Sequence, residues 1–301
     1  MKISGFSFVR NGDKLYYPVV ESIQSILPIC DEFIVAVGDC DDDDKTLELI
    51  KAIDSNKIRI IQTKWTDRDK LKGKIHSQQT NIALKECTGD WCFYIQSDEV
   101  VHENDLPAIK QRCEELLEDK DVEGLLFKYN HFWGDYNHVH RNHAWYPNEI
   151  RIIKNNRNII SWNTAQSFRK SDGSKIKATY VNAEIFHYGW VRPPQLMQNK
   201  RAEFGRTHLG LKKQLKMFED EKTKYNYGSL ENISVFRGTH PKVMQPRISQ
   251  FNWGDKLQYE GKSSMMHQHN KFKYKFLSFI EYVIFGGKVH LGAKKWSLIR
   301  R

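Results

Sequence analysis

The sequence has few of the features that mark secreted or membrane-spanning proteins. Its five cysteines are spread over 301 residues with no Cys-x-x-Cys pair, which argues against a disulfide framework or a structural zinc site and favours a reducing compartment. No apolar run approaches the roughly 20 residues of a membrane helix. The first residues hold no apolar export segment. We therefore expect a cytoplasmic protein.

Three common ligand-binding motifs are also missing. No Gly-x-Gly-x-x-Gly follows the first predicted strand, which weakens a dinucleotide-binding interpretation. Residues 261–263 resemble the end of a P-loop, but the earlier glycine position is Lys256. His102-Glu103 has no second histidine at the spacing of a zinc protease.

The net charge is +10, yet residues 271–301 alone carry eight basic residues and one acidic residue. Nucleic-acid binding would therefore have to rest on that tail.

Strands and helices alternate through the first half of the chain. Short apolar strands are predicted at 3–9, 33–37, 58–61, 91–95 and 124–129. Helical spacing lies between them, in a helix capped by Asp13, another from about Asp44, one through 82–84 and one over 106–117. This alternation predicts a mostly parallel sheet covered on both faces. Ligands bind such sheets at the carboxyl ends of the strands.

The pattern changes after about residue 130. A strand is predicted at 149–153 and another ending near His187, followed by helical spacing over 196–218 and 272–285. We expect a catalytic domain over 1–192, with a donor half at about 1–100 and an acceptor half at about 101–192. The remainder, 193–301, is predicted as a helical extension with a basic amphipathic tail.

Acidic residues follow two of the predicted strands. Asp39 and the run 41–44 come after the second strand, and Asp98 follows the fourth. Carboxylates that meet at one edge raise each other's pKa unless a positive charge lies between them, and Mg²⁺ or Mn²⁺ would supply that charge and leave coordination places for a diphosphate. The acids of 41–44 also suit a helix N-terminus. Asp98 does not, because the next helix begins near residue 104.

The segments 6–11, 37–46 and 89–99 resemble the family-2 glycosyltransferases of the GT-A fold, and 149–153 and 187–192 resemble a bacterial subgroup of that family. The resemblance covers about residues 1–200. It implies a Rossmann-like GT-A sheet and transfer of a sugar from a nucleotide donor, in cell-envelope polysaccharide biosynthesis.

The same resemblance implies roles for particular residues. Asp39 would accept a hydrogen bond from the nucleotide base, in a pocket lined by the Val9-Arg10 backbone. Asp98 would bind the metal that bridges the phosphates, and His187 matches a further metal ligand. Gln96 stands where the family usually has the first Asp of Asp-x-Asp, so the implied Mg²⁺ or Mn²⁺ site has one carboxylate fewer than is usual.

An inverting transfer also needs a carboxylate to take the proton of the acceptor hydroxyl. We favour Glu149, with Asp135 and Glu184 as rivals, while Glu149 could instead pair with Arg151 on one strand. Arg151 could also hold a phosphate, since a guanidinium binds oxyanions in a bidentate manner. Gln78 is a candidate base or phosphate contact, or plain surface.

The middle of the chain is rich in histidine and aromatic residues. The spacing of His131, His138, His140 and His143 matches no helical ligand pair, so we do not expect a dedicated zinc site. The aromatic residues Trp133, Trp145 and Tyr146 suit a sugar-acceptor pocket, although core packing is the commonest role of any single tryptophan. In the tail, Phe276, Phe279, Ile280 and Val283 among lysines predict an amphipathic helix, which would lie on an anionic membrane or pack on the catalytic domain.

The sequence thus predicts an inverting glycosyltransferase acting on a glycan or lipid-linked glycan, at the inner face of the membrane if the tail binds lipid, and without nucleic acid as a partner. One alternative is a sugar nucleotidyltransferase, but residues 9–13 lack the glycine-rich loop such an enzyme needs. The other is a basic module that binds membrane or nucleic acid without catalysis.

Overall fold

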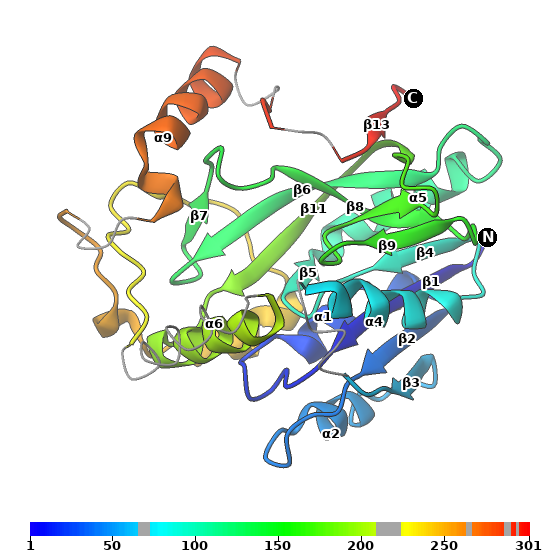
Figure 1. The fold of residues 1–301 in the computed structure, drawn as a ribbon, viewed down its shortest axis with the longest axis horizontal. Helices are drawn as coiled ribbons and strands as arrows, with labels where there is room; N and C mark the ends of the chain where they lie inside the picture. Colours follow the sequence, from blue (N-terminus) through cyan, green and yellow to red (C-terminus); the bar gives the residue numbers. More distant parts are fainter. Residues whose placement is uncertain (66–72, 209–223, 263–266, 286–289, 293–294) are drawn as a thin grey trace.

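The computed structural model describes residues 1–65, 73–208, 224–262, 267–285, 290–292 and 295–301. Its centre is a twisted sheet (Figure 1) in which four strands run parallel in the order β4-β1-β2-β3. These strands are β1 (Ile3–Val9), β2 (Glu32–Val37), β3 (Ile58–Gln62) and β4 (Trp91–Tyr94). They confirm the predicted Rossmann-like α/β fold of GT-A type with its parallel sheet.

The sheet continues past β4 with mixed strand directions. β8 (Asn148–Lys154) runs antiparallel between β4 and β6 (Gly124–Trp133), and the long β11 (Lys177–Trp190) pairs parallel with β6. Short strands complete the edges: β5 (Glu99–Val101), β7 (His138–His140), β12 (Ser234–Val235) and β13 (Ser297–Leu298). β9 (Ile159–Trp162) and β10 (Ser167–Lys170) form a separate hairpin.

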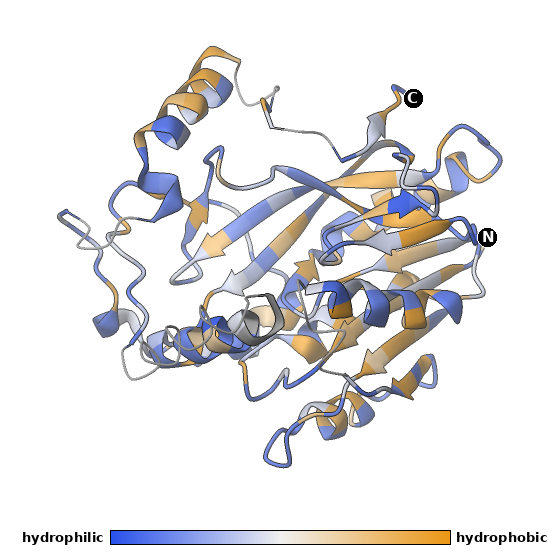
Figure 2. Ribbon diagram, viewed as in Figure 1, coloured by the Kyte–Doolittle hydropathy of each residue, from blue (hydrophilic) through white to orange (hydrophobic). Residues whose placement is uncertain are grey.

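Both faces of β1, β2 and β4 are buried, which explains why their sequences are predominantly apolar. Val35 and Val37 pack into one core with α1 (Val19–Ile26) and α5 (Leu106–Glu115). Ile34 and Ala36, on the opposite face, pack with α4 (Lys74–Lys85). Figure 2 shows these central strands as predominantly hydrophobic ribbons. The alternation of side chains along a strand thus divides a single apolar run between two cores.

The first helix begins later than the sequence suggests. Asp13 does not cap it, because α1 starts only after Pro18. Asn11 and Tyr16 have φ values of 52° and 60°, a left-handed conformation that an α-helix cannot contain. The segment between them forms turns that bring Leu15 to the cavity described below. α2 (Thr46–Lys51) follows β2, and the Asp44 carboxylate accepts the backbone N–H of Thr46 at 3.0 Å.

The part of the chain after β11 contains short elements. They are α6 (Pro194–His208), η4 (Lys242–Met244), α8 (Gln245–Ser249), η5 (Gly254–Lys256), η6 (Gln268–Asn270), α9 (Phe272–Ser278) and a π-helical segment, η7 (Phe279–Ile284). The rest of the helix predicted over 196–218 lies outside the described residues. Met244 and Trp253 share a core cluster with Phe132 and Tyr188 of the sheet. The C-terminal part thus packs on the sheet. The predicted domain boundary at residue 192 remains a prediction.

Candidate active site

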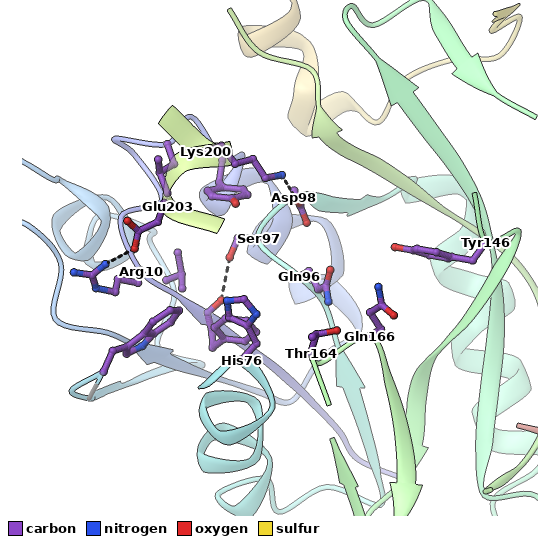
Figure 3. Close-up of a pocket in the computed structure, with 15 residues that line it drawn as sticks. Arg10, His76, Gln96, Ser97, Asp98, Tyr146, Thr164, Gln166, Lys200 and Glu203 are labelled. Atoms are coloured by element: carbon purple, nitrogen blue, oxygen red, sulfur yellow. Dashed lines mark hydrogen bonds and ion pairs between the residues drawn. The ribbon is translucent and has the colours of Figure 1, made fainter. Parts of the chain in front are cut away.

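A cavity of about 450 Å³ lies at the carboxyl ends of β1 and β4, the edge at which parallel sheets bind ligands. Figure 3 shows Arg10, His76 and Glu203 on one side of it and Tyr146, Thr164 and Gln166 on the other. Gln96, Ser97 and Asp98 lie between the two groups. Of the predicted donor-site residues, Val9, Arg10, Gln96 and Asp98 line this cavity.

One side of the cavity is aromatic. The ring of Phe8 stacks on His76 with centroids 5.6 Å apart, and Trp65 meets His76 edge to face at 5.7 Å. The Arg10 guanidinium lies 5.7 Å from the Trp65 ring. Asp39 stands beside this group, where its carboxylate accepts the backbone N–H of Trp65 at 3.0 Å. A flat ring bearing an N–H donor would find both a stacking surface and an acceptor here.

Helix α6 closes this side through an ion pair. Arg10 donates to Glu203 at 2.9 Å and to the Asp39 backbone oxygen at 2.9 Å. Lys200 lies three residues before Glu203, on the same face of the helix. Both side chains therefore face the ends of the sheet, and both line the cavity.

Asp98 lies close to two nitrogen-bearing side chains, Lys200 and His187. Its carboxylate lies 3.3 Å from the Lys200 ammonium and 3.6 Å from His187 Nε2. Burial opposes the ionisation of Asp98, but Lys200 and His187 outweigh it and hold the pKa of this carboxyl well below its usual range. Burial together with Arg192 lowers the pKa of Lys200 to about 7, against the opposite effect of Asp98. The site therefore keeps a carboxylate and an amine together out of bulk water.

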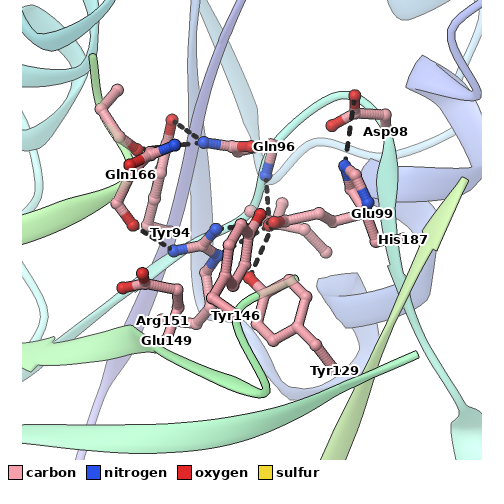
Figure 4. Close-up of polar contacts among 12 residues, drawn as sticks. Tyr94, Gln96, Asp98, Glu99, Tyr129, Tyr146, Glu149, Arg151, Gln166 and His187 are labelled. Atoms are coloured by element: carbon pink, nitrogen blue, oxygen red, sulfur yellow. Dashed lines mark hydrogen bonds and ion pairs between the residues drawn. The ribbon is translucent and has the colours of Figure 1, made fainter. Parts of the chain in front are cut away.

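Two histidines orient each other behind Asp98. His131 Nε2 lies 2.8 Å from the Tyr146 carbonyl, which can only accept, so this nitrogen carries the proton. Burial keeps the pKa of His131 well below normal and the ring neutral, so its Nδ1 accepts from His187 Nδ1 at 3.0 Å. The other ring nitrogen of His187, Nε2, faces Asp98 at 3.6 Å (Figure 4).

The surroundings fit a divalent cation at this point. A carboxylate oxygen and an imidazole nitrogen converge here, a donor set that Mn²⁺ and similar ions accept. Gly189 leaves room beside them, because a Cβ there would lie 2.6 Å from both Asp98 Oδ2 and His187 Nε2. The Lys200 ammonium, which also donates to the Gly189 carbonyl at 2.7 Å, is a second source of positive charge at the same carboxylate.

Arg151, one of the two predicted catalytic residues, is fully buried next to the cavity and does not line it. Its guanidinium forms a bidentate pair with Glu99 at 2.7 and 2.6 Å and lies 5.3 Å from the rings of Tyr94 and Tyr129. Glu99 in turn accepts the backbone N–H of Gln96 at 3.1 Å. Figure 4 shows this network directly below the loop that carries Asp98. Nε and Nη2 of Arg151 thus help to fix that loop through Glu99, while Nη1 donates to the Ile150 and Gln166 carbonyls at 2.9 and 3.1 Å.

Glu149, the other predicted catalytic residue, is also fully buried and outside the cavity lining. It pairs with Lys295, which also contacts the Gln166 amide oxygen at 3.2 Å. The rival bases lie elsewhere. Asp135 accepts two backbone N–H groups in a turn, and Glu184 accepts the Asn130 amide at 2.7 Å. Neither lines the cavity.

The environment of Glu149 predicts a pH-dependent effect on stability. Burial raises the pKa of this carboxyl despite Lys295. The native state therefore holds its proton more tightly than the unfolded state, and this contribution to stability is lost as pH rises above the unfolded pKa of about 4.5. Relative to the native protein, Glu149→Gln should become more stable as pH increases from 4.5 to 8.

Urea unfolding at several pH values measures this difference. Glu184→Gln, the same change at a half-buried carboxylate of β11, controls for the substitution itself. A difference between Glu149→Gln and the native protein that is constant with pH would contradict the expectation.

The structure also identifies site residues that sequence patterns did not indicate. Lys200, Glu203, Trp65 and His76 line the cavity. Gln78, the predicted contact on the same helix as His76, is exposed and does not line it. Two positions along a helix turn the side chain by about 200°, so only one of the two can face the site. The spacing of Lys200 and Glu203 places both on one face of a helix. The sequence does not show that this face lies over the strand ends, so the spacing alone could not identify them as site residues.

The aromatic residues predicted to line an acceptor pocket divide into two groups. Tyr146 lines the cavity. Trp133 and Trp145 pack instead in a cluster with Trp190, at centroid distances of 5.6 to 5.8 Å for the Trp145 contacts. Trp133 is fully buried, and its indole donates to the Tyr227 carbonyl at 3.0 Å.

No family model and no curated protein matches the chain, whereas solved structures do. S. aureus TarS matches with 12% identity over 74% of this chain and 43% of that chain, at a TM-score of 0.39. Its fragment 1–349 in complex with UDP-GlcNAc matches with 16% identity over 74% and 72% of the two chains, at 0.38. Glucosyl-3-phosphoglycerate synthase from Mycobacterium tuberculosis, with Mn²⁺, UDP and glucosyl-3-phosphoglycerate bound, matches with 20% identity over 44% and 45%, at 0.29. The match thus spans less than half of that TarS chain.

Proposed function

We propose that this protein transfers a sugar from a nucleoside-diphosphate donor to a glycan or lipid-linked glycan acceptor. The observation that carries the proposal is the pairing of an aromatic wall with a buried charge cluster. Phe8, Trp65 and His76 form the wall, and Asp98 and Lys200 lie across the same cavity. The aromatic wall suits the base of a nucleotide, and the charge cluster suits its diphosphate.

The base of the donor would lie against the aromatic wall. Asp39 accepts hydrogen bonds only, so it favours a base with a ring N–H, such as uracil or guanine, over cytosine. Arg10 borders the cavity on the side of this wall, where its ion pair with Glu203 holds it in place. Stacking of a base on aromatic rings contributes about 1–3 kcal/mol.

The diphosphate would lie over Asp98, Lys200 and His187. A divalent ion held by Asp98 and His187 would neutralise the negative charge that develops on the leaving diphosphate. Lys200 donates hydrogen bonds to the same region and supplies positive charge of its own. Gln96 has a structural part here, because its side-chain amide donates to the Ala165 carbonyl at 3.0 Å. This bond ties the loop of Asp98 to the wall that carries Thr164 and Gln166.

The sugar and the acceptor would lie between Gln96 and the opposite wall. Tyr146 presents a ring and Thr164 and Gln166 present polar atoms on this side, as sugars require. We propose that Glu149 acts here as a positioning residue, because Lys295 joins it to Gln166. Arg151 would position Asp98 through Glu99. Both roles act through neighbours and need no contact with substrate.

Nucleotide binding tests the proposal directly. We expect isothermal calorimetry to show binding of UDP or GDP in the presence of Mn²⁺ and much weaker binding of CMP. Trp65→Ala should weaken the bound nucleotide about tenfold to hundredfold, since the loss of one stacking partner costs about 1–3 kcal/mol.

Trp162→Ala is the matched control, because Trp162 is 46% exposed on the β9 hairpin and does not line the cavity. Circular dichroism would confirm that both variants fold. Absence of binding for all three nucleotides, or equal binding by Trp65→Ala, would contradict the proposal.

The acceptor class is proposed from the surface of the C-terminal helical segment, 272–284. Phe272, Phe276, Phe279 and Val283 are 83, 53, 54 and 66% exposed, and their spacing places them on one face of a helix. Lysines at 271, 273 and 275 accompany them. None of the helices in the described parts of the chain is both long and apolar enough to cross a bilayer. A basic, apolar stripe of this kind suits the surface of an anionic membrane.

Sedimentation with lipid vesicles measures this contact. The full chain should bind vesicles containing phosphatidylglycerol, bind phosphatidylcholine vesicles at least about tenfold more weakly, and lose binding to the former in Phe276→Ser/Phe279→Ser. Trp162→Ser removes an exposed aromatic residue elsewhere and should bind as the native protein does. Equal binding of the double variant to anionic vesicles would contradict a membrane role for the stripe.

A further inference from the structure

Two histidines and a glutamate meet where the C-terminal helical segment contacts the loop between β7 and β8. His143 belongs to this loop, Glu281 to the π-helical η7, and His290 to the chain beyond it. His143 Nδ1 lies 2.7 Å and His290 Nδ1 3.1 Å from the same oxygen, Glu281 Oε1. One ligand atom from each residue lies within 4.8 Å of the other two. We name this group the 143–281–290 cluster.

The carboxylate at its centre is unevenly satisfied. Glu281 is 1% exposed. Its Oε1 faces both imidazoles and accepts the backbone N–H of Leu291 at 2.6 Å, whereas Oε2 is buried and has no hydrogen-bond partner among the described residues. An unpaired carboxylate oxygen removed from water is costly unless a cation lies near it. The cluster therefore has the ligands of a cation site and a polar atom that a bound cation would satisfy.

The ligand types and spacing select the ion. Two imidazoles and one carboxylate are a common zinc set, which leaves a fourth position for water. With Zn–N and Zn–O bonds of about 2.0–2.1 Å, tetrahedral ligand atoms lie ~3.4 Å apart. The observed separations of 2.7 and 3.1 Å from Glu281 need to open by only a fraction of an ångström. Each imidazole would bind through Nδ1 and carry its proton on Nε2.

We propose that His143, Glu281 and His290 bind a zinc ion that fastens the C-terminal segment to the loop 141–147. The backbone N–H of His143 already donates to Ser278 Oγ at 2.9 Å, so loop and helix are in register without the metal. Glu281 lies in a π-helical turn, a local irregularity that often accompanies functional sites. The same loop carries Tyr146 of the cavity, although the zinc site itself does not depend on the proposed function.

Metal analysis of the full chain, purified without a histidine tag, tests the site. After dialysis with zinc, the native protein should retain one ion per chain in this cluster, and its melting temperature should rise relative to EDTA. His290→Gln and His143→Gln should weaken zinc binding by at least about tenfold to hundredfold, the range found when only a supporting residue is lost. His290→Cys, which keeps a zinc ligand, should retain the ion.

Controls separate this cluster from Asp98 and His187. Asp98→Asn removes a ligand from that other site and should leave the zinc of the cluster in place. His138→Gln removes a histidine that lies outside the cluster and pairs with Asp135 at 2.9 Å, so the zinc should again remain. Cobalt substitution should give the strong visible absorption of a four-coordinate site, absent in His290→Gln.

Equal melting temperatures in EDTA would show that His290→Gln folds normally. The proposal is overturned if the native protein binds no zinc, if His143→Gln and His290→Gln retain it as tightly as the native protein, or if Asp98→Asn alone abolishes it.

Discussion

Asp98→Asn is expected to lower sugar transfer by about two to three orders of magnitude, the effect of removing one preorganised electrostatic group from an active site. The amide keeps the size of the side chain but not its charge. Lys200 then loses the carboxylate that raises its pKa, so burial favours its neutral form. A single substitution would thus remove both the carboxylate and much of the positive charge that face the diphosphate.

Release of nucleoside diphosphate from UDP- and GDP-sugars measures this effect. Asp43→Asn is the matched control, because Asp43 belongs to the acidic run after β2 and its side chain is 70% exposed beside Lys14. It should leave turnover unchanged. If Asp98 and His187 hold a divalent ion, EDTA lowers the turnover of the native protein and has no further effect on Asp98→Asn. Native turnover in a folded Asp98→Asn protein would refute the assignment.

The parallel strands and the position of Asp98 could be predicted because both depend on local pattern. β1, β2 and β4 are apolar runs buried on both faces, and the carboxyl ends of such strands share one edge. The start of α1 could not be predicted from apolar spacing, because the left-handed Tyr16 and Pro18 delay the helix. Only backbone geometry reveals that delay.

The ion-pair partners of the buried charged residues could not be predicted from the sequence. Asp98 meets Lys200 across 102 residues, and Glu99 meets Arg151 across 52. Alternation along β8 indicates which side chains share a face, but it does not tell whether an arginine there faces a ligand or a buried acid. Arg151 and Glu149 were natural candidates for chemistry because buried ion pairs and catalytic groups use the same residue types. Tertiary placement alone separates the two.

Arg151→Met is expected to lower the free energy of unfolding by about 3–5 kcal/mol, the cost of leaving one partner of a buried ion pair alone. Glu99 would stay fully buried, and among the described residues its remaining donors would be the Tyr129 hydroxyl, at 2.7 Å, and the Gln96 backbone N–H. Urea unfolding measures the loss. Arg59→Met is the control, because the Arg59–Glu86 pair is about half exposed on both sides and such pairs contribute about 0–1 kcal/mol.

A double variant distinguishes a structural role of Arg151 from phosphate binding. Adding Glu99→Gln to Arg151→Met removes the unpaired charge and should restore part of the stability, with a coupling energy of about 0.5–3 kcal/mol in the double-mutant cycle. Turnover should remain low in the double variant, because the geometry that fixes Gln96 and Asp98 is not rebuilt. If Arg151 contacts a phosphate instead, Arg151→Met would raise the nucleotide Kd with little change in unfolding, and Glu99→Gln would rescue nothing. The bidentate geometry and the full burial of both side chains favour the first outcome.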